Sequence, residues 1–322
     1  MSTSTIQVGP AAVAAGPAPA RRLNGRWRKR LEIGLFVGPA LLVYITFVLL
    51  PVVLAAVYSF FKWNGYGPLN DFIGIDNYVR ALNDHVFREA ILHNLTFVVA
   101  SLIVQGPIAI GIALLLNRRI RGRSIMRVII FIPYVLSEVI AGLIWKLLLL
   151  PHGPFDSVMA AFGLSDFRQL WLGDTNVVLW TLFGIVSWKY IGFAIILFLA
   201  GLQGVPEELA EAAQIDGATW WQTQRHITIP LLAPTIRIWA FLSIIGSLQL
   251  FDIVWIVTNG GPANATTTMA TYMVQFGFQR SQLGFGSAVA VILFIVSLVF
   301  ALFYQRFVLR RDLDGAITRG VH

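Results

Sequence analysis

The sequence predicts an all-α, polytopic membrane protein with six transmembrane helices, and two observations support this fold class. Of the 322 residues, 57% are hydrophobic and 12% are charged, whereas about a quarter of the residues of a soluble domain are charged. Six apolar runs also follow one another along the chain. Each has roughly the 20 residues that a helix needs to cross ~30 Å of hydrocarbon.

The first span follows a basic N-terminal stretch. Residues 1–30 are expected to form a cytoplasmic tail that is mostly disordered, because residues 1–20 are rich in Ala, Pro, Ser and Thr. The apolar run after them extends to about Phe61 and contains Pro39 and Pro51. It is too long for the apolar part of a signal peptide, and no small-residue cleavage site follows it. We therefore expect a first transmembrane helix.

The other five apolar runs set the limits of the remaining spans: Leu95–Leu116, Val128–Leu150, Val177–Ala200, Ile236–Thr258 and Ala288–Phe307. Residues 72–95, before the second of the six spans, combine helical periodicity with mixed polarity. They are expected to form a short interfacial helix that leads into that span.

The distribution of Lys and Arg predicts the orientation. Basic residues concentrate in residues 21–30, in the loop between spans 2 and 3 and after residue 305, while the opposite loops hold only Lys62, Arg80, Arg88, Arg168 and Arg280. Cytoplasmic loops carry the excess of Lys and Arg. Both termini, including the tail 311–322, are therefore expected in the cytoplasm. The net charge of +8 follows from these loops and does not indicate nucleic-acid binding.

Several kinds of site are missing from the sequence. There is no Cys, and none of the four lysines is followed by Ser or Thr as a P-loop requires. The five histidines lack the spacing of a zinc site, and no G-x-S-x-G motif occurs. An aspartate pair in the tail, Asp312 and Asp314, is interpreted as solvated charge. We expect no catalytic, metal or cofactor site in this chain, and a membrane enzyme is disfavoured.

The stretch EELAEAAQIDGATWWQTQRHITIP, residues 207–230, lies in the predicted cytoplasmic loop between spans 4 and 5, at about 202–234. Pro206 suits the first turn of a helix, and the glutamates that follow favour its N-terminal end. Gly217 permits a sharp turn before a second helix, which Pro230 is expected to end. Such a helix–glycine–helix segment lies at the membrane surface and is available to a partner.

This stretch resembles the EAA loop of the permease subunits of ATP-binding-cassette importers. The matching positions are Glu211, Ala212, Ala213, Asp216, Gly217 and Ala218, with the block ending at Pro230. Two other stretches, GIALLLNRRIRGRSIMRVIIFIPYVLSEVIAGLIW and FDIVWIVTNGGP, are similar to the carbohydrate-uptake, maltose-type branch of that family. The likeness covers about residues 31–310, the predicted permease domain.

The resemblance implies a type I ABC importer permease fold in a bacterial cytoplasmic membrane and a transport role without enzyme activity. It implies a second homologous permease subunit, two cytoplasmic ATPase subunits that use ATP and Mg²⁺, an extracytoplasmic solute-binding protein, and a sugar substrate. The EAA-like positions would dock on the ATPase as a coupling helix. Small alanines permit close approach, and Glu211 offers charge-assisted hydrogen bonds.

Ionisable residues inside the spans are costly and need a role. Glu138, Lys146, Lys189 and Asp252 are the residues concerned. Glu138 and Lys189 could form a structural ion pair, or the acidic residues could line the solute passage. Gln249 and Asp252 are three residues apart, so one helical face would present both, and Asn259 would continue that line.

A sugar needs amide or carboxylate partners and aromatic rings. Trp145, Trp188, Tyr190 and Trp255 could supply the rings, or could serve as interfacial anchors or packing. In the maltose-type family span 5 contributes to the sugar site, which favours Gln249 and Asp252. A permease for glycerol phosphate or another polyol remains an alternative, as does a secondary transporter, although six spans without an internal repeat argue against the latter.

Overall fold

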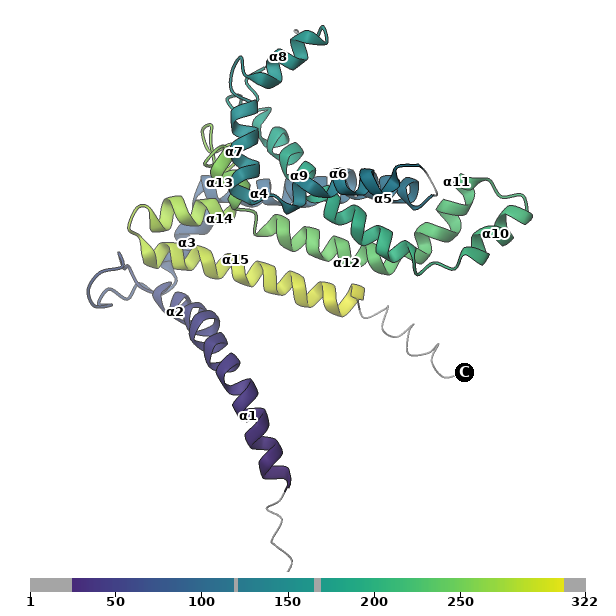
Figure 1. Ribbon diagram of the computed structural model, residues 1–322. Helices are drawn as coiled ribbons and strands as arrows, with labels where there is room; N and C mark the ends of the chain where they lie inside the picture. Colours follow the sequence, from purple (N-terminus) through teal and green to yellow (C-terminus); the bar gives the residue numbers. More distant parts are fainter. Residues whose placement is uncertain (1–24, 119–120, 165–168, 310–322) are drawn as a thin grey trace, which may run out of the picture. The chain divides into compact units, whose positions relative to one another are not determined.

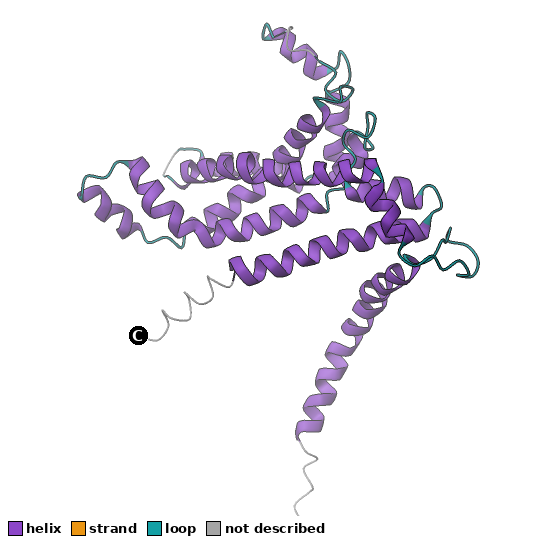
Figure 2. Cartoon of the chain, turned by 180° about the vertical axis from the view of Figure 1, so that it is seen from behind, coloured by secondary structure: helices purple, strands orange, loops and turns teal. Residues whose placement is uncertain are grey.

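The computed structural model of the protein describes residues 25–118, 121–164 and 169–309. Within these ranges the chain is helical, apart from loops and one isolated bridge between Phe61 and Phe72 (Figures 1 and 2). The α-helices are α1 Gly25–Tyr44, α2 Leu50–Tyr58, α3 Asp76–Asn83, α4 His85–Ala100, α5 Gly106–Asn117, α6 Arg123–Val135, α7 Glu138–Leu148, α8 Pro154–Ala161, α9 Val178–Leu202, α10 Glu207–Ile215, α11 Trp220–Thr223, α12 Ile229–Leu248, α13 Asp252–Val257, α14 Met269–Tyr272 and α15 Leu283–Tyr304.

The described helices confirm the all-α membrane fold with six spans. Five helical stretches are long and apolar enough to cross a bilayer: Glu32–Tyr58, His85–Asn117, Val178–Leu202, Trp220–Val257 and Leu283–Leu309. The sixth span is the pair α6 and α7, which is bent by 97°. The span expected over Val128–Leu150 therefore consists of two helices with a sharp bend between them.

The chain divides into two compact units, residues 1–53 and 54–322. The first unit is the start of span 1. It contains Pro39 and Pro51 as expected, but its helix already begins at Gly25, so residues 25–30 belong to the helix and not to a disordered tail. Residues 1–24, residues 311–322 and the aspartates at 312 and 314 lie outside the described residues.

Prolines near the start of three helical segments each follow a π-helical turn. Pro51, Pro107 and Pro230 come two residues after the turns Ile45–Leu49, Ser101–Gln105 and Gln224–Thr228. In each case the residue before the proline donates its N–H to the carbonyl five residues back. A proline lacks an N–H and its ring crowds the carbonyl four residues back, so the wider turn lets the helix continue.

Pro230 therefore does not end the second helix of the loop, contrary to expectation. Helical residues run from Trp220 through the π-helical turn into α12, with Pro230 in the first turn of α12. The proposed interfacial helix over residues 72–95 is also wrong as a single element. It consists of α3 and the beginning of α4, separated by Asp84, whose carboxylate accepts from the Phe87 N–H. Helix α4 is itself the beginning of span 2.

Two of the three buried apolar clusters of the second unit lie around its central helices. One joins α5, α9 and α12, which pack along one another (Figure 1), around Phe198, Leu232 and Trp239. The other joins α4, α7, α9 and α13 around Leu182 and Ile253. Helices α6 and α9 also approach closely, since a Cβ at Gly192 would clash with the Ile130 carbonyl. The candidate site lies beside both clusters.

Candidate functional site

A cavity of about 430 Å³ opens among the helices of the second unit. Its lining comes from span 2, the α6–α7 bend, α9, and the region where α12 gives way to α13. Four of the residues predicted to bind solute line it, namely Glu138, Tyr190, Gln249 and Asp252. The structure thus brings together predicted residues from spans 3, 4 and 5.

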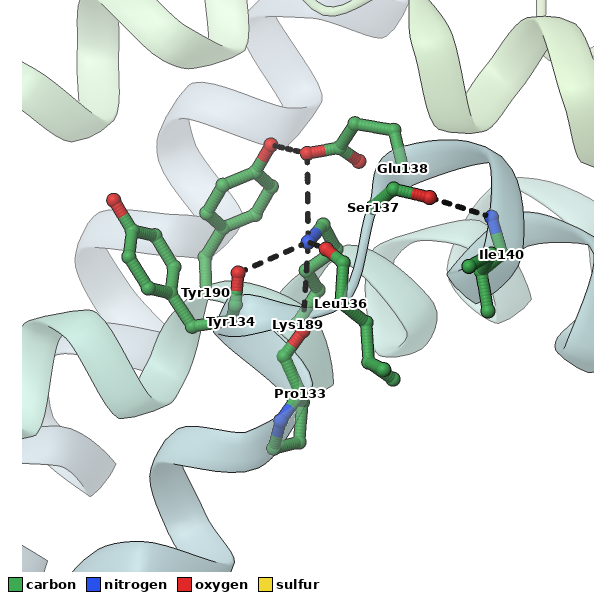
Figure 3. Close-up of polar contacts among 8 residues, drawn as sticks. All are labelled: Pro133, Tyr134, Leu136, Ser137, Glu138, Ile140, Lys189 and Tyr190. Atoms are coloured by element: carbon green, nitrogen blue, oxygen red, sulfur yellow. Dashed lines mark hydrogen bonds and ion pairs between the residues drawn. The ribbon is translucent and has the colours of Figure 1, made fainter.

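Lys189 holds the bend of span 3 together (Figure 3). Helix α6 ends at Val135, and the Ser137 side chain starts α7 by accepting from the Ile140 N–H at 3.2 Å. The buried ammonium of Lys189 donates to the carbonyls of Pro133, Tyr134 and Leu136, at 3.4, 3.3 and 2.6 Å. A helix C-terminus leaves carbonyls without partners, and a cation is well suited to satisfy them.

Glu138 is the first residue of α7 and faces the same ammonium. Its Oε1 lies 3.6 Å from Lys189 Nζ and accepts from the Tyr190 hydroxyl at 2.5 Å (Figure 3). The ion pair that the sequence suggested is therefore present. Its Oε2 is buried and has no hydrogen-bond partner among the described residues. Glu138 is thus both a member of a structural pair and a lining residue of the cavity.

Span 5 is broken as well, between Leu248 and Asp252. Here a neutral amide takes the place of the cation. Buried Asn94 on α4 donates to the carbonyls of Ser247 and Leu248, at 2.6 and 3.2 Å, and accepts from the Met269 N–H at 2.8 Å. The Thr268 hydroxyl donates to the Leu250 carbonyl at 2.7 Å. Non-helical backbone at membrane depth is tolerated where protein groups satisfy it.

This break corrects the expected geometry of span 5. Gln249 caps the end of α12 and Asp252 begins α13, so the two do not share a helical face. Both nevertheless line the cavity. Asn259 lies beyond α13 with φ of 50°, and its backbone carbonyl accepts from the Gln275 amide at 2.6 Å. It does not continue the line of Gln249 and Asp252 and is not part of the lining.

The three predicted tryptophans lie outside the lining. Trp145 and Trp188 pack edge to face with ring centroids 5.4 Å apart, and Trp255 stacks on Phe251 at 5.3 Å. Trp145 also packs against the cluster around Leu182 and Ile253. These contacts match the packing interpretation of the tryptophans. Tyr190 is the predicted ring that reaches the cavity.

Several lining residues were missed in the sequence. The rings of Tyr134 and Phe193 stack at 5.2 Å and border the cavity. Polar groups also come in pairs at helical spacing, Ser101 with Gln105 and Ser243 with Ser247, and all four line it. Ser243 donates to Ser101 across the helices at 2.8 Å. Polar residues four apart inside apolar spans were the available signal.

The loop between spans 4 and 5 has the helix–glycine–helix form that was expected. Gly217 adopts φ of +83°, which favours glycine. Its N–H donates to the Gln214 carbonyl at 3.0 Å, and the Ala218 N–H donates to the Ala213 carbonyl at 2.9 Å. These two bonds form a Schellman motif at the end of α10. A capping box between Thr219 and Gln222 then starts α11.

The loop presents an exposed surface. Glu211, Ala212 and Asp216 are exposed, Ala213 and Ala218 half-buried, and Ile215 is 87% exposed. The Arg118 guanidinium covers the Trp220 ring at 4.3 Å, which joins the end of span 2 to the loop. The loop lies at the end of α9 and α12 opposite to α7 and α13 (Figure 1). It is a capped helix–glycine–helix element with an exposed face.

Comparison with known proteins identifies the family. Residues 105–312 match the family model described as "Binding-protein-dependent transport system inner membrane component". The chain belongs to this family. It is therefore a multi-pass membrane protein and a permease-type inner membrane component of an ABC transport system, in agreement with the resemblance found in the sequence.

Relatives cover most of the chain. A probable starch degradation products transport permease of Thermoanaerobacterium thermosulfurigenes is 30% identical over 90% of this chain and 97% of its own length. A diacetylchitobiose uptake permease of Streptomyces coelicolor is 33% identical over 88% of this chain and 86% of its own. A trehalose/maltose transport permease of Thermococcus litoralis is 31% identical over 84% and 92%. All three permease proteins are similar to this chain over 86–97% of their own lengths.

Solved structures give the same fold. A chain of a bacterial ABC transporter that imports the acidic polysaccharide alginate is similar with a TM-score of 0.77 and 25% identity, over 89% of this chain and 99% of that one. The same TM-score is found for the alginate transporter in complex with an alginate-bound periplasmic protein. The type I importer permease fold expected from the sequence is confirmed.

Proposed function

We propose that this chain is the permease subunit of an ATP-driven, binding-protein-dependent sugar importer and forms half of its translocation pathway. The observation that carries the proposal is the cavity at the two broken spans. Carboxylates, amides, hydroxyls and aromatic rings meet there, which are the groups that a sugar requires. Discontinuous membrane helices are a common way to build such a site at membrane depth. The sugar-transport relatives support the same substrate class.

The other subunits of the assembly would supply the second half of the pathway, the delivery of the sugar and the hydrolysis of ATP. A second homologous permease would complete the pathway, and an extracytoplasmic binding protein would deliver the sugar. Two cytoplasmic ATPase subunits would bind ATP and Mg²⁺, since the sequence contains no P-loop. The chain itself then binds no cofactor and catalyses no reaction. Both termini would face the cytoplasm, on the side of the Lys- and Arg-rich loops.

The loop Glu207–Thr228 would act as the coupling element. Its open face, with Glu211, Ala212 and Ala213, would seat on the ATPase, and Gly217 would keep its two helices at a fixed angle. Helical structure is continuous from α11 through α12 to Leu248. Movement of the loop would therefore reach Ser243 and Ser247 in the cavity directly. The membership of a binding-protein-dependent family supports this ATP-driven mechanism over a secondary transporter.

The coupling role is tested with Gly217→Asp in the purified complete assembly. No atom lies within 4 Å of the position that a Cβ on Gly217 would take, so the damage would come from its positive φ. We expect normal assembly but no stimulation of ATP hydrolysis by sugar-loaded binding protein, and Glu211→Lys should act in the same way. The control is Gly163→Asp, at a glycine with φ of +75° and equally open surroundings. Normal stimulation in Gly217→Asp would contradict the coupling role.

A further inference from the structure

The charged groups that this chain places in the cavity are acidic. Among the described residues of the lining, Glu138 and Asp252 carry a charge, and none is Lys, Arg or His. The other polar lining groups are neutral, namely serine and tyrosine hydroxyls and the amides of Gln105 and Gln249. The cavity face of this chain therefore offers an anion no basic partner.

Lys189 offsets only one of the two carboxylates. Its ammonium pairs with Glu138 and is held by three backbone carbonyls, and its buried side chain is not part of the lining. Asp252 is exposed, and no ion pair joins it to another residue in the part of the chain that the structure describes. One negative charge in the cavity is thus left uncompensated.

This charge favours some solutes over others. Resting on the proposed function, we propose that this chain selects uncharged sugars and amino sugars and rejects acidic ones, such as uronic acids and phosphorylated sugars or polyols. Asp252 repels a negatively charged solute in the partly desolvated cavity. We expect this repulsion to weaken the binding of an acidic sugar about tenfold or more relative to an uncharged one.

Uncharged sugars and amino sugars both fit the lining chemically. Sugar hydroxyls can donate to the Asp252 carboxylate, which is exposed and lines the cavity. An ammonium group on an amino sugar would add an opposite charge to the same carboxylate. The stacked rings of Tyr134 and Phe193 offer an apolar surface for the face of the sugar ring. None of these contacts requires a cation from the protein.

The likeness to the alginate importer does not carry over to the charge of the solute. That transporter imports an acidic polysaccharide and shares the fold at 25% identity. Backbone similarity sets where a cavity lies, whereas the side chains that line it set which solute is bound. The lining of this chain points away from acidic solutes.

The test is equilibrium binding to the purified assembly of permeases and ATPases, without binding protein, so that the cavity alone selects. Three tritiated disaccharides serve as probes: diacetylchitobiose (uncharged), the glucosamine disaccharide (cationic) and digalacturonate (anionic). We expect digalacturonate to bind at least about tenfold more weakly than diacetylchitobiose. In Asp252→Asn the ratio between the affinities for diacetylchitobiose and digalacturonate should fall about tenfold. The glucosamine disaccharide should bind more weakly than to the unmodified assembly.

The matched control is Asp76→Asn, an exposed aspartate that is likewise the first residue of a helix, α3, and is not part of the cavity lining. It should leave the order of the three probes unchanged. Equal binding of digalacturonate and diacetylchitobiose in the unmodified assembly, or an unchanged ratio of these two affinities in Asp252→Asn, would overturn the inference. If no probe binds and no sugar-loaded binding protein stimulates ATP hydrolysis, the proposed function fails instead.

Discussion

The two broken spans solve the same problem with different chemistry. At each break the carbonyls at the end of a membrane helix need donors, and a buried side chain from another helix supplies them. At the α6–α7 bend the donor is the ammonium of Lys189. At the α12–α13 break it is the uncharged amide of Asn94. In both cases an acidic residue, Glu138 or Asp252, begins the next helix.

The difference determines what each acidic residue is free to do. A buried cation requires a counter-charge, so Glu138 is held in an ion pair with Lys189. An amide requires none, so Asp252 stays exposed to the cavity without an ion-pair partner in the described part of the chain. Glu138 therefore belongs to the structure of its break, whereas Asp252 is available to a solute.

Among substitutions at the two breaks, Lys189→Met should lower the stability of the assembly most. It leaves three carbonyls and a carboxylate without their donor, and removing one partner of a buried ion pair costs about 3–5 kcal/mol. We expect a strong fall in the Tm and yield of the assembled complex. The control is Lys146→Met, at a lysine on α7 whose long, exposed contact is with the Ile256 carbonyl. A wild-type Tm for Lys189→Met would show that the cation does not hold the bend.

Asn94→Ala should be damaging, but less so. The carbonyls of Ser247 and Leu248 and the Met269 N–H lose a buried partner, which costs about 1–3 kcal/mol for an unsatisfied group. Thr268 still satisfies the Leu250 carbonyl at this break. The Tm of the assembly should fall by less than in Lys189→Met. A larger fall in Tm than in Lys189→Met would show that the amide of Asn94 contributes more to stability than the ammonium of Lys189.

Tyr190→Phe should have the smallest effect of the three. It removes the hydroxyl that donates to Glu138 Oε1 but keeps the ring, and Lys189 still pairs with the carboxylate. A loss of about 1 kcal/mol in stability is expected for one hydrogen bond. Thermal unfolding of the assembly measures it. A loss as large as that of Lys189→Met would mean that the tyrosine hydroxyl, and not the lysine, is the main stabilising partner of Glu138.

The sequence predicted the elements whose signals are local. The apolar runs gave the spans, and Pro206, Gly217 and the EAA-like pattern gave the coupling loop. The continuation of the helix through Pro230 was missed because the π-helical turn that permits it has no clear local signature.

The two breaks could not be predicted because distant residues stabilise them. Ser137 caps the start of α7, and the carbonyls before it are satisfied by Lys189, which comes from a later span. No proline or glycine lies between Leu248 and Asp252, and that break depends on Asn94 and Thr268. The cavity lies at these breaks, so its lining residues Tyr134 and Phe193 could not be predicted without them.

The central claim is that Glu138 serves the structure and Asp252 serves the solute. A side-by-side measurement of Tm and sugar affinity in Glu138→Gln and Asp252→Asn assemblies tests it most directly. Glu138→Gln should lower the Tm clearly, because Lys189 is left buried without its counter-charge. Asp252→Asn should change the stability by no more than about 0.5 kcal/mol, yet weaken binding of the sugar about tenfold. A fall in Tm for Asp252→Asn equal to that of Glu138→Gln, with unchanged sugar affinity, would contradict the account.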